Sequence, residues 1–537
     1  MNARLKSLLA RALLVAALAG IALLLVWLMR PPAEPSQTST LRRGNGSEAE
    51  SLDPQAARSE AALTIARDLF EGLMRVGPTG EALPAAAASV EVSADGLRYV
   101  FHLRPGLAWS NGDALEAADF LAAWRRLVDP ATAAPYAQML APVHNAAAIT
   151  AGKARPESLG VQAPHAGTLM VDLERPAAHF LALMTHPASF PLHRASLARY
   201  GSRFAKPGLL VSNGAYALSR WDFGSKILAV RNHHYWDDAH TRIERIEYHV
   251  IPQPAAELAA YRADALDITA TVPTEQLPWI RAHLAGELHV APQLAVYYYA
   301  LNLSGGPFKG SKALRIALSM VIDREQLVRA ITALGEMPAY SFVPPGTHGY
   351  SPARPAYADW PMARRIERAR ELLREGGGAP GPIELRYNTG DLHARLAVAV
   401  ASMWKQALGI DTVLRAEEFK VLLQDIQHRK GLQAFRASWV ADYDDPYSFL
   451  QLLRGGFGIN LPGYASAAYD SRLDEANRAT DPTVRASLLQ RAEGQMLEDQ
   501  PLIPLYFYVS KRLVKPRVQG FSDDPLNIVY SKDLVLR

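Results

Sequence analysis

Alternating hydrophobic and polar positions mark strands in this chain, while other stretches repeat with the period of a helix. Residues 99–104 and 243–251 alternate and are rich in β-branched and aromatic side chains, which predicts strands. Residues 117–128 repeat large apolar side chains on one face, which predicts a helix that ends before Asp129-Pro130. This mixture predicts an α/β chain with more than one lobe. Further helices are expected at 312–334, 363–374 and 393–408.

The first thirty residues have the pattern of an export segment. Three basic residues precede an uncharged run over 12–29, which as a helix would span about 27 Å, close to the thickness of a bilayer core. The run ends in bulky residues, whereas signal peptides are cut after small ones, so we expect 1–30 to stay as a membrane anchor. A cleaved signal peptide is the alternative. The basic residues place the body outside the cytoplasm, after a proline-rich linker over 31–41.

Composition excludes several classes of protein. A length of 537 residues suggests about three to four domains. The net charge of +4 is small for this size and no basic run is interleaved with aromatic residues, so nucleic acid is not indicated as a partner. The chain has no cysteine, which excludes disulfides, thiolate metal ligands, a cysteine nucleophile and the lipid anchor of bacterial lipoproteins.

The segment 436–446 carries the most informative acid. Asp442 follows an apolar run directly and stands beside aromatic residues, with Arg436 six positions upstream. A carboxylate at the end of a semi-buried segment needs a compensating partner, because an unpaired buried charge is costly. The partner is either internal, such as Arg436, or a cationic group that arrives with a ligand.

A series of short segments resembles, in order and spacing, the periplasmic oligopeptide-binding proteins, which are the solute-binding components of ABC importers. The resemblance extends over about residues 46–537 and favours the oligopeptide binders over the dipeptide and nickel binders. The segments lie at 51–54, 67–73, 101–104, 109–112, 212–216, 297–302, 387–393 and 436–446.

The resemblance implies an α/β, two-lobed, three-domain periplasmic binding protein fold of the class II, or cluster C, type, with a hinge that the chain crosses twice. An oligopeptide would add as a strand between the lobes and be enclosed when they close. The family implies no cofactor, no metal and a monomer in the periplasm, with the membrane subunits of an ABC importer as partners. The expected domains are 42–60 with 207–300 and 506–537, then 61–206 on the same lobe, and 301–505 as the second lobe.

By this resemblance, Asp442 is the acid that binds the α-ammonium group of a peptide through a charge-assisted hydrogen bond. Ser438 and Val440, on either side of Trp439, would offer backbone groups to the peptide. Two alternatives stay open. In the first, Asp442 is a structural partner of Arg436 or a surface acid rather than a ligand group. In the second, Trp439 is an ordinary core residue.

Arg436 and His393 resemble the family's anchors for a ligand carboxylate, and Tyr136 resembles a pocket tyrosine. Each has a structural alternative, in which Arg436 neutralises Asp442, His393 begins a helix and Tyr136 packs at the surface of a lobe.

Two positions depart from the family. Arg58 stands where well-studied members carry an acid that faces the ligand, and Gln427 stands where some members present an arginine. The hypothesis that follows is a pocket changed from acidic to basic, which tolerates acidic peptides and disfavours lysine-rich ones.

An enzyme is the main rival interpretation, and the sequence does not favour it. It contains no Gly-x-Ser-x-Gly nucleophile motif and no His-Glu-x-x-His zinc motif. Residues 305–312 resemble a phosphate loop only superficially, and His233-His234 is expected in a turn. We therefore expect a binding protein without catalytic activity. A membrane-tethered envelope sensor or peptide chaperone and a receptor for murein tripeptide are the alternatives within that class.

Overall fold

The structure is a computed structural model of the chain and describes residues 40–378, 381–428, 431–456 and 459–537. The expected anchor and nearly all of the expected linker lie outside these residues. Within the described ranges, no helix combines the length and the apolar character needed to cross a bilayer. Residues 41–537 form one compact unit.

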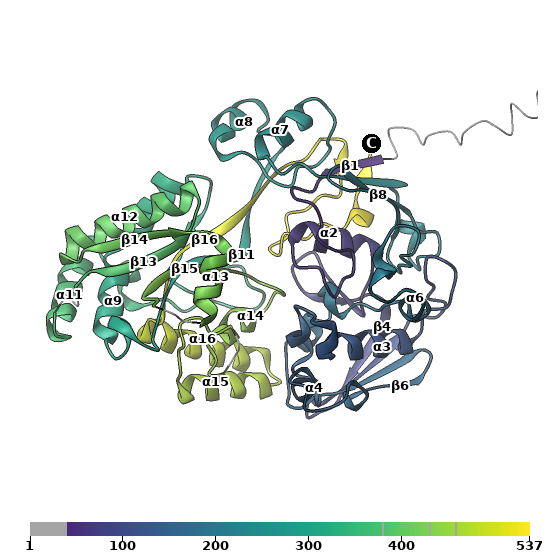
Figure 1. The fold of residues 1–537 in the computed structure, drawn as a ribbon, viewed down its shortest axis with the longest axis horizontal. Helices are drawn as coiled ribbons and strands as arrows, with labels where there is room; N and C mark the ends of the chain where they lie inside the picture. The colour runs from purple at the N-terminus through teal and green to yellow at the C-terminus, as the bar shows by residue number, and fades with distance from the viewer. Residues whose placement is uncertain (1–39, 379–380, 429–430, 457–458) are drawn as a thin grey trace, which may run out of the picture. The chain divides into compact units, whose positions relative to one another are not determined.

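A first sheet has four strands in the order β1-β10-β9-β8. Figure 1 labels its two edge strands, β1 and β8. The four strands are β1 (Thr40–Gly44), β8 (Tyr216–Asp222), β9 (Lys226–Arg231) and β10 (Arg245–His249). β10 confirms the strand predicted over 243–251. Helix α2 (Glu60–Leu69) packs against β8, and the side chain of Ser59 caps its first turn by accepting the N–H of Ala62.

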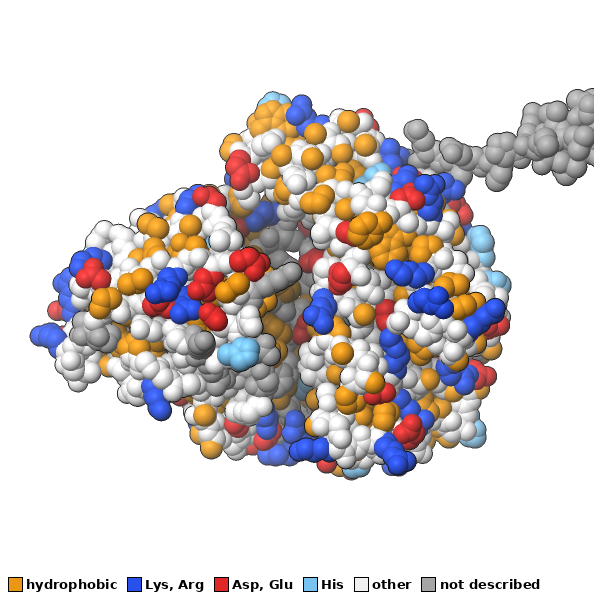
Figure 2. Space-filling model, in the orientation of Figure 1, with side chains coloured by type: hydrophobic (Ala, Val, Ile, Leu, Met, Phe, Trp, Pro, Cys, Tyr) orange, Lys and Arg blue, Asp and Glu red, His pale blue; other side chains and the backbone are white. Residues whose placement is uncertain are grey.

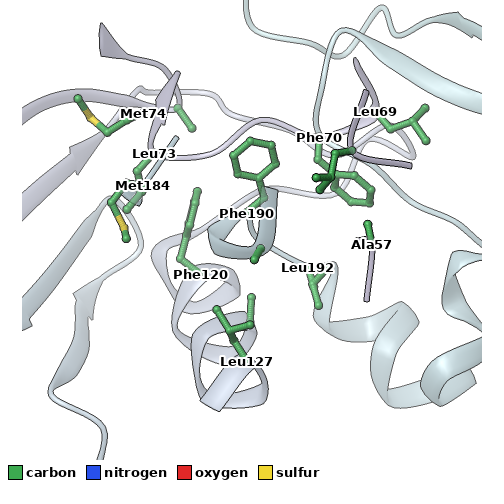
Figure 3. Packing of buried hydrophobic residues seen from close by; sticks show 14 of the residues in the cluster. Ala57, Leu69, Phe70, Leu73, Met74, Phe120, Leu127, Met184, Phe190 and Leu192 are labelled. Carbon is green, nitrogen blue, oxygen red and sulfur yellow. The ribbon is translucent and has the colours of Figure 1, made fainter. Parts of the chain in front are cut away.

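A second sheet is antiparallel throughout, in the order β4-β5-β7-β6. Its strands are β4 (Ala87–Val92), β5 (Arg98–Leu103), β6 (Val161–His165) and β7 (Thr168–Asp172), and β5 confirms the strand predicted over 99–104. Helix α3 (Ala117–Val128) covers β6 and β7 and has the predicted bounds, because Pro130 prevents its continuation. Figure 3 shows Phe120 and Leu127 of α3 in one apolar cluster with Leu73, Phe190 and Leu192.

A third sheet has six strands in the order β12-β16-β11-β15-β13-β14 (Figure 1). β11 pairs antiparallel with β15 and β16, whereas β13 pairs parallel with β14 and β15. Helices α11 and α12 confirm the predictions over 363–374 and 393–408. The elements are β11 (Leu288–Leu301), β12 (Met337–Pro338), β13 (Ile383–Asn388), β14 (Thr412–Glu417), β15 (Ala434–Val440), β16 (Leu502–Leu513), α11 (Met362–Glu375) and α12 (Asp391–Leu408).

The prediction of one helix over 312–334 is wrong. Helix α9 (Lys312–Met320) ends early, and α10 (Arg324–Leu327) begins after Asp323, whose side chain accepts the N–H of Gln326. The guanidinium of Arg324 donates to the carbonyls of Ser319 at 3.0 Å and Ile322 at 3.4 Å, where the end of α9 needs donors. Local capping therefore overrides the continuous hydrophobic pattern.

Strands β11 and β16 run through two of the expected domain boundaries, at 300 and 505. The ladder between them is interrupted between Pro292 and Val296 and between Tyr297 and Tyr298. The domain boundaries themselves stay a prediction. The remaining elements are β2 (Met74–Val76), β3 (Ala82–Pro84), β17 (Val518–Gln519), β18 (Val535–Leu536), α4 (Ala146–Thr150), α5 (Phe180–Leu183), α6 (Arg194–Tyr200), α7 (Pro254–Arg262), α8 (Leu277–His283), α13 (Phe419–His428), α14 (Tyr447–Leu450), α15 (Ala467–Arg478) and α16 (Pro482–Asp499).

Candidate ligand-binding site

Strand β15 leaves most of one edge uncovered. It pairs with β11 along its whole length, but on its other side β13 reaches only its first two residues. Just beyond the strand, Ala441 donates its N–H to the carbonyl of Leu294 in β11 at 2.8 Å. Backbone groups alternate sides along an antiparallel ladder, so those of Ser438 and Val440 face away from β11. They line an edge that no described strand covers, which is the arrangement that accepts an added strand.

Asp442 follows this edge, and its carboxylate has no partner in the part of the chain that the structure describes. The two neighbouring acids are engaged in the fold. Asp445 forms a bidentate ion pair with Arg485 at 2.7 and 2.8 Å, and Asp444 accepts the N–H of His348 at 2.8 Å. Asp444 Oδ2 is buried without a partner among the described residues, but Asp442 is the one of the three acids whose carboxylate accepts no hydrogen bond there and faces the cavity beside β15.

Burial raises the pKa of Asp442 to about 7, well above the usual range of an aspartate. The side chain is partly accessible, because it faces a cavity. A positive group in that cavity would stabilise the ionised form, and within the described part of the chain no residue lowers this pKa appreciably.

The cavity in front of Asp442 has a volume of about 330 Å³. It brings together five of the predicted site residues: Asp442, Trp439, Val440, Tyr136 and Arg58. Its walls come from the end of β15, from α2 and the residues before it, and from the loops around positions 136 and 186. Figure 2, in the orientation of Figure 1, shows a hollow between the part of the molecule that carries β15 and the part that carries α2.

Sequence reasoning missed Glu60, Arg67 and His186, which also line this cavity. Glu60, Leu63 and Arg67 are spaced three and four residues apart on α2 and so share one face, which is a signal that the sequence did contain. Arg67 has a buried Nε without a hydrogen-bond partner among the described residues. Within the described residues, the cavity therefore combines the unpaired carboxylate of Asp442 with the side chains of Arg58 and Arg67.

Tyr136 and His186 form an aromatic wall of this cavity, with ring centroids 4.5 Å apart. Burial, and then the charge of Asp442, raises the pKa of Tyr136 to about 12, so its hydroxyl stays a donor. Burial lowers the pKa of His186 to about 3, and its Nδ1 accepts the N–H of Ala188 at 3.2 Å. The wall is therefore neutral at physiological pH.

Arg436 lies outside the Asp442 cavity and contacts only neutral groups. Its guanidinium donates to Ser438 Oγ at 3.1 Å, to Asn388 Oδ1 at 3.3 Å and to the Tyr508 hydroxyl at 3.3 Å. The predicted alternative of an ion pair with Asp442 is therefore wrong, because the side chain turns towards Ser438 instead. A half-buried guanidinium without an anion in the described structure is a suitable place for a ligand carboxylate.

Tyr297 contacts both Arg436 and His393 and so links the two side chains. The Tyr297 ring lies 5.0 Å from the Arg436 guanidinium, and its hydroxyl is 3.2 Å from His393 Nδ1. Burial, and then the charge of Arg436, lowers the pKa of His393 to about 4, so the imidazole is neutral. His393 also stands in the first turn of α12, so the structural alternative describes its place correctly as well.

Trp439 is neither an ordinary core residue nor a free surface residue. It is half-buried against an apolar cluster, and its buried indole Nε1 has no partner among the described residues. It lines the Asp442 cavity and a smaller one of about 70 Å³. In the smaller cavity the ring of His179 stacks on Tyr447 at 4.4 Å and on Tyr443 at 5.6 Å.

The two departures from the family have different outcomes. Arg58 is exposed and lines the Asp442 cavity. Gln427 lies in α13, and its side chain is outside the described residues, so that part of the basic-pocket hypothesis stays a prediction.

Comparisons with known proteins identify the family. The model of the bacterial extracellular solute-binding proteins, family 5, matches residues 81–460. The periplasmic oligopeptide-binding protein OppA of Escherichia coli is 37% identical, over 93% of this chain and 93% of its own. The probable deoxycholate-binding periplasmic protein YgiS of the same species is 39% identical, over 94% of this chain and 95% of its own.

A solved structure supports the same assignment. The Escherichia coli murein tripeptide binding protein MppA superposes with a TM-score of 0.81 at 35% identity, over 93% of this chain and 99% of its own. The mixed α/β fold described above is thus the two-lobed fold of binding proteins. This chain belongs to family 5 of the bacterial extracellular solute-binding proteins.

Proposed function

We propose that this protein captures oligopeptides outside the cytoplasm and delivers them to an ABC importer, without chemical change. The observation that carries the proposal is the unpaired carboxylate of Asp442 at the end of the open edge of β15. A peptide α-ammonium group on Asp442 lets the peptide backbone continue along Ser438 and Val440 as an added strand. Main-chain hydrogen bonds of this kind give affinity without selecting a side-chain sequence.

The far end of the peptide lies at Arg436 and His393 in this proposal. The Arg436 guanidinium reaches Ser438, four positions before Asp442, and four strand positions span about 13 Å. An extended peptide of about three to four residues bridges that distance between its ammonium and carboxylate groups. Longer peptides would extend past Arg436 and lose this ion pair.

Binding of blocked and unblocked peptides tests the proposal. We expect tri- and tetrapeptides with free termini to bind in calorimetric titrations, and N-acetylation to abolish most of the affinity because Asp442 loses its cation. We expect to recover the peptide intact after incubation with the protein. Hydrolysis of the peptide would show that the protein is an enzyme and would refute binding without chemical change. Equal affinity for acetylated and free peptides would refute the role of Asp442.

The relatives raise two other ligands. OppA and MppA are named for oligopeptides and for murein tripeptide, whereas YgiS is named for deoxycholate. Deoxycholate carries a carboxylate but no amine, so it would leave Asp442 unpaired, and we favour peptides for that reason. A murein tripeptide has an amine and carboxylates and fits both ends, so it belongs in the same titrations. A dominant wall peptide released by the denatured protein would indicate a dedicated receptor.

Export to the periplasm follows from the basic and apolar pattern of residues 1–30 and from the relatives' periplasmic names. We infer that the segment stays attached and tethers the protein to the inner membrane, which would raise its concentration near an importer. Fractionation of cells tests this. Recovery of a shortened chain in the soluble periplasmic fraction would indicate a cleaved signal instead. Purification of the protein from membranes is the second test, and an absence of importer subunits from the purified material would favour a sensor or chaperone.

A further inference from the structure

A second polar cavity, of about 290 Å³, shares Glu60 of α2 with the Asp442 cavity and has otherwise different lining residues. It forms where the end of β1, the segment around Ile268 and the end of β16 meet. Isolated bridges join Arg43 to Ile268 and Ile268 to Val514, so the three segments are neighbours (Figure 1). The proposed peptide site does not use this cavity.

Arg43 and Arg512 are both buried cations on the wall of this cavity, and Arg512 is the one without an ion pair among the described residues. Its side chain comes from β16, and the residue is only 7% exposed. One guanidinium nitrogen donates to Asn527 Oδ1, and no carboxylate in the described ranges lies within ion-pair distance of it. Burial, and then the charge of Arg43, lowers its pKa to about 10. The guanidinium still carries its charge at physiological pH.

The other arginines in this part of the fold each have a buried acid as partner. Arg42 and Arg517 both pair with the buried Asp267, at 3.2 and 2.6 Å. Arg43 lies 3.6 Å from the buried Asp68. Arg512 has no comparable internal acid, and an uncompensated buried charge is costly to maintain.

Three acids act on the charge of Arg512, and each has another contact. Asp523 Oδ2 lies 3.3 Å from His289 Nδ1. Glu257 accepts the N–H groups of Ala270 at 2.9 Å and Thr271 at 3.3 Å. Glu60, on the wall of the cavity, accepts the side-chain amide of Asn527. The amide of Asn527 thus separates Glu60 from Arg512, and the guanidinium keeps several unused donors.

We propose that this cavity binds a small oxyanion, either a carboxylate or a tetrahedral anion such as sulfate or phosphate, on the guanidinium of Arg512. Ser47 and Thr64 also line the cavity and bring hydroxyl groups that can donate to an anion. The volume corresponds to the share of about ten liquid waters, which admits such an anion with part of its hydration shell. This site is independent of the proposed peptide function.

Equilibrium dialysis of the full chain against labelled sulfate, phosphate or acetate, without peptide, tests the site directly. We expect one equivalent of at least one of these anions to bind in the millimolar range or tighter. Arg512→Met should weaken binding at least tenfold, and Arg512→Lys should retain part of it because the charge remains. No bound equivalent of any of the three anions would overturn the proposal.

Thermal unfolding in sulfate and in chloride of equal ionic strength provides a second readout. Sulfate stabilises most proteins by exclusion from their surface, and that contribution is common to the parent and the variants. Binding of sulfate at Arg512 should raise the unfolding temperature further in the parent and in Arg512→Lys, and this additional rise should vanish in Arg512→Met. An equal gain in the parent and Arg512→Met would contradict a bound anion. In low-anion buffer, we expect Arg512→Met to unfold no earlier than the parent, because it removes an uncompensated charge.

Discussion

Replacing Asp442 with asparagine should weaken peptide binding and stabilise the free protein at the same time. The carboxylate has no partner in the described structure, so in the absence of ligand its charge only costs desolvation energy. With a peptide bound, the same charge compensates the α-ammonium group. If Asp442 served only the fold, its replacement would not weaken peptide binding and raise the stability of the free protein together.

The magnitudes follow from the surroundings of Asp442. Burial raises its pKa from 3.8 to about 7. Between those values the folded protein holds a proton that the unfolded chain has lost, so the free energy of unfolding falls as pH rises. The fall is about 1.4 kcal/mol per pH unit and at most about 4 kcal/mol in total, and it is complete above pH 7. Loss of one partner of a desolvated ion pair costs about 3 kcal/mol or more, which is at least a hundredfold in Kd.

The assay compares the parent, Asp442→Asn and a matched control, Asp445→Asn. Asp445 is paired with Arg485, so its variant should be less stable than the parent. Asp442→Asn should be at least as stable at pH 7.5, should lose part of the decline in stability between pH 4 and 7, and should bind a free tripeptide at least a hundredfold more weakly. Reduced stability together with unchanged Kd in Asp442→Asn would refute the reasoning.

Four further predictions follow from the same structure. Peptide binding in the parent should weaken as pH falls from 7 to 5, by up to about tenfold per pH unit, because protonation of Asp442 removes the partner of the ammonium group; titration calorimetry at several pH values measures this, and an unchanged Kd would contradict it. Arg436→Gln should weaken binding of free tripeptides about tenfold to a hundredfold and leave their C-terminal amides unaffected, and an equal loss for both would contradict a carboxylate anchor. Arg58→Glu should shift the relative affinity from acidic towards basic tripeptides by roughly tenfold, and unchanged relative affinities would refute the basic pocket. Glu493 accepts three backbone N–H groups and the Tyr350 hydroxyl, so Glu493→Ala should lower the free energy of unfolding by about 3 kcal/mol or more in urea titrations, while Glu498→Ala on the same helix should change little.

Local patterns in the sequence predicted elements better than they predicted partners. The helix over 117–128 has its predicted bounds because the apolar spacing and the following proline act within a few residues. The helix over 312–334 fails because Asp323 caps a new helix and Arg324 donates to the carbonyl of Pro504, which only the folded chain places beside it. The spacing of Glu60 and Arg67 predicts that they share one face of α2, but it does not predict which segment that face lies against.

The candidate site shows the same division. The sequence singled out Asp442 by its unusual position, yet it left Arg436 as an open internal partner. Only the three-dimensional structure shows the guanidinium turned towards Ser438 and Asn388. The open edge of β15 also depends on where β13 stops, and no periodicity within 434–440 reports that.

The interruption in β11 has a mechanical consequence. Between Pro292 and Val296 this strand loses its pairing with β16, and Leu294 donates its N–H to the carbonyl of Pro525 instead. The carbonyl of Leu294 accepts the N–H of Ala441, the residue directly before Asp442. The backbone before Asp442 is thus fixed to the irregular part of β11 by this hydrogen bond and by the ladder that follows it, so the local shape of a long strand sets the position of a single charge.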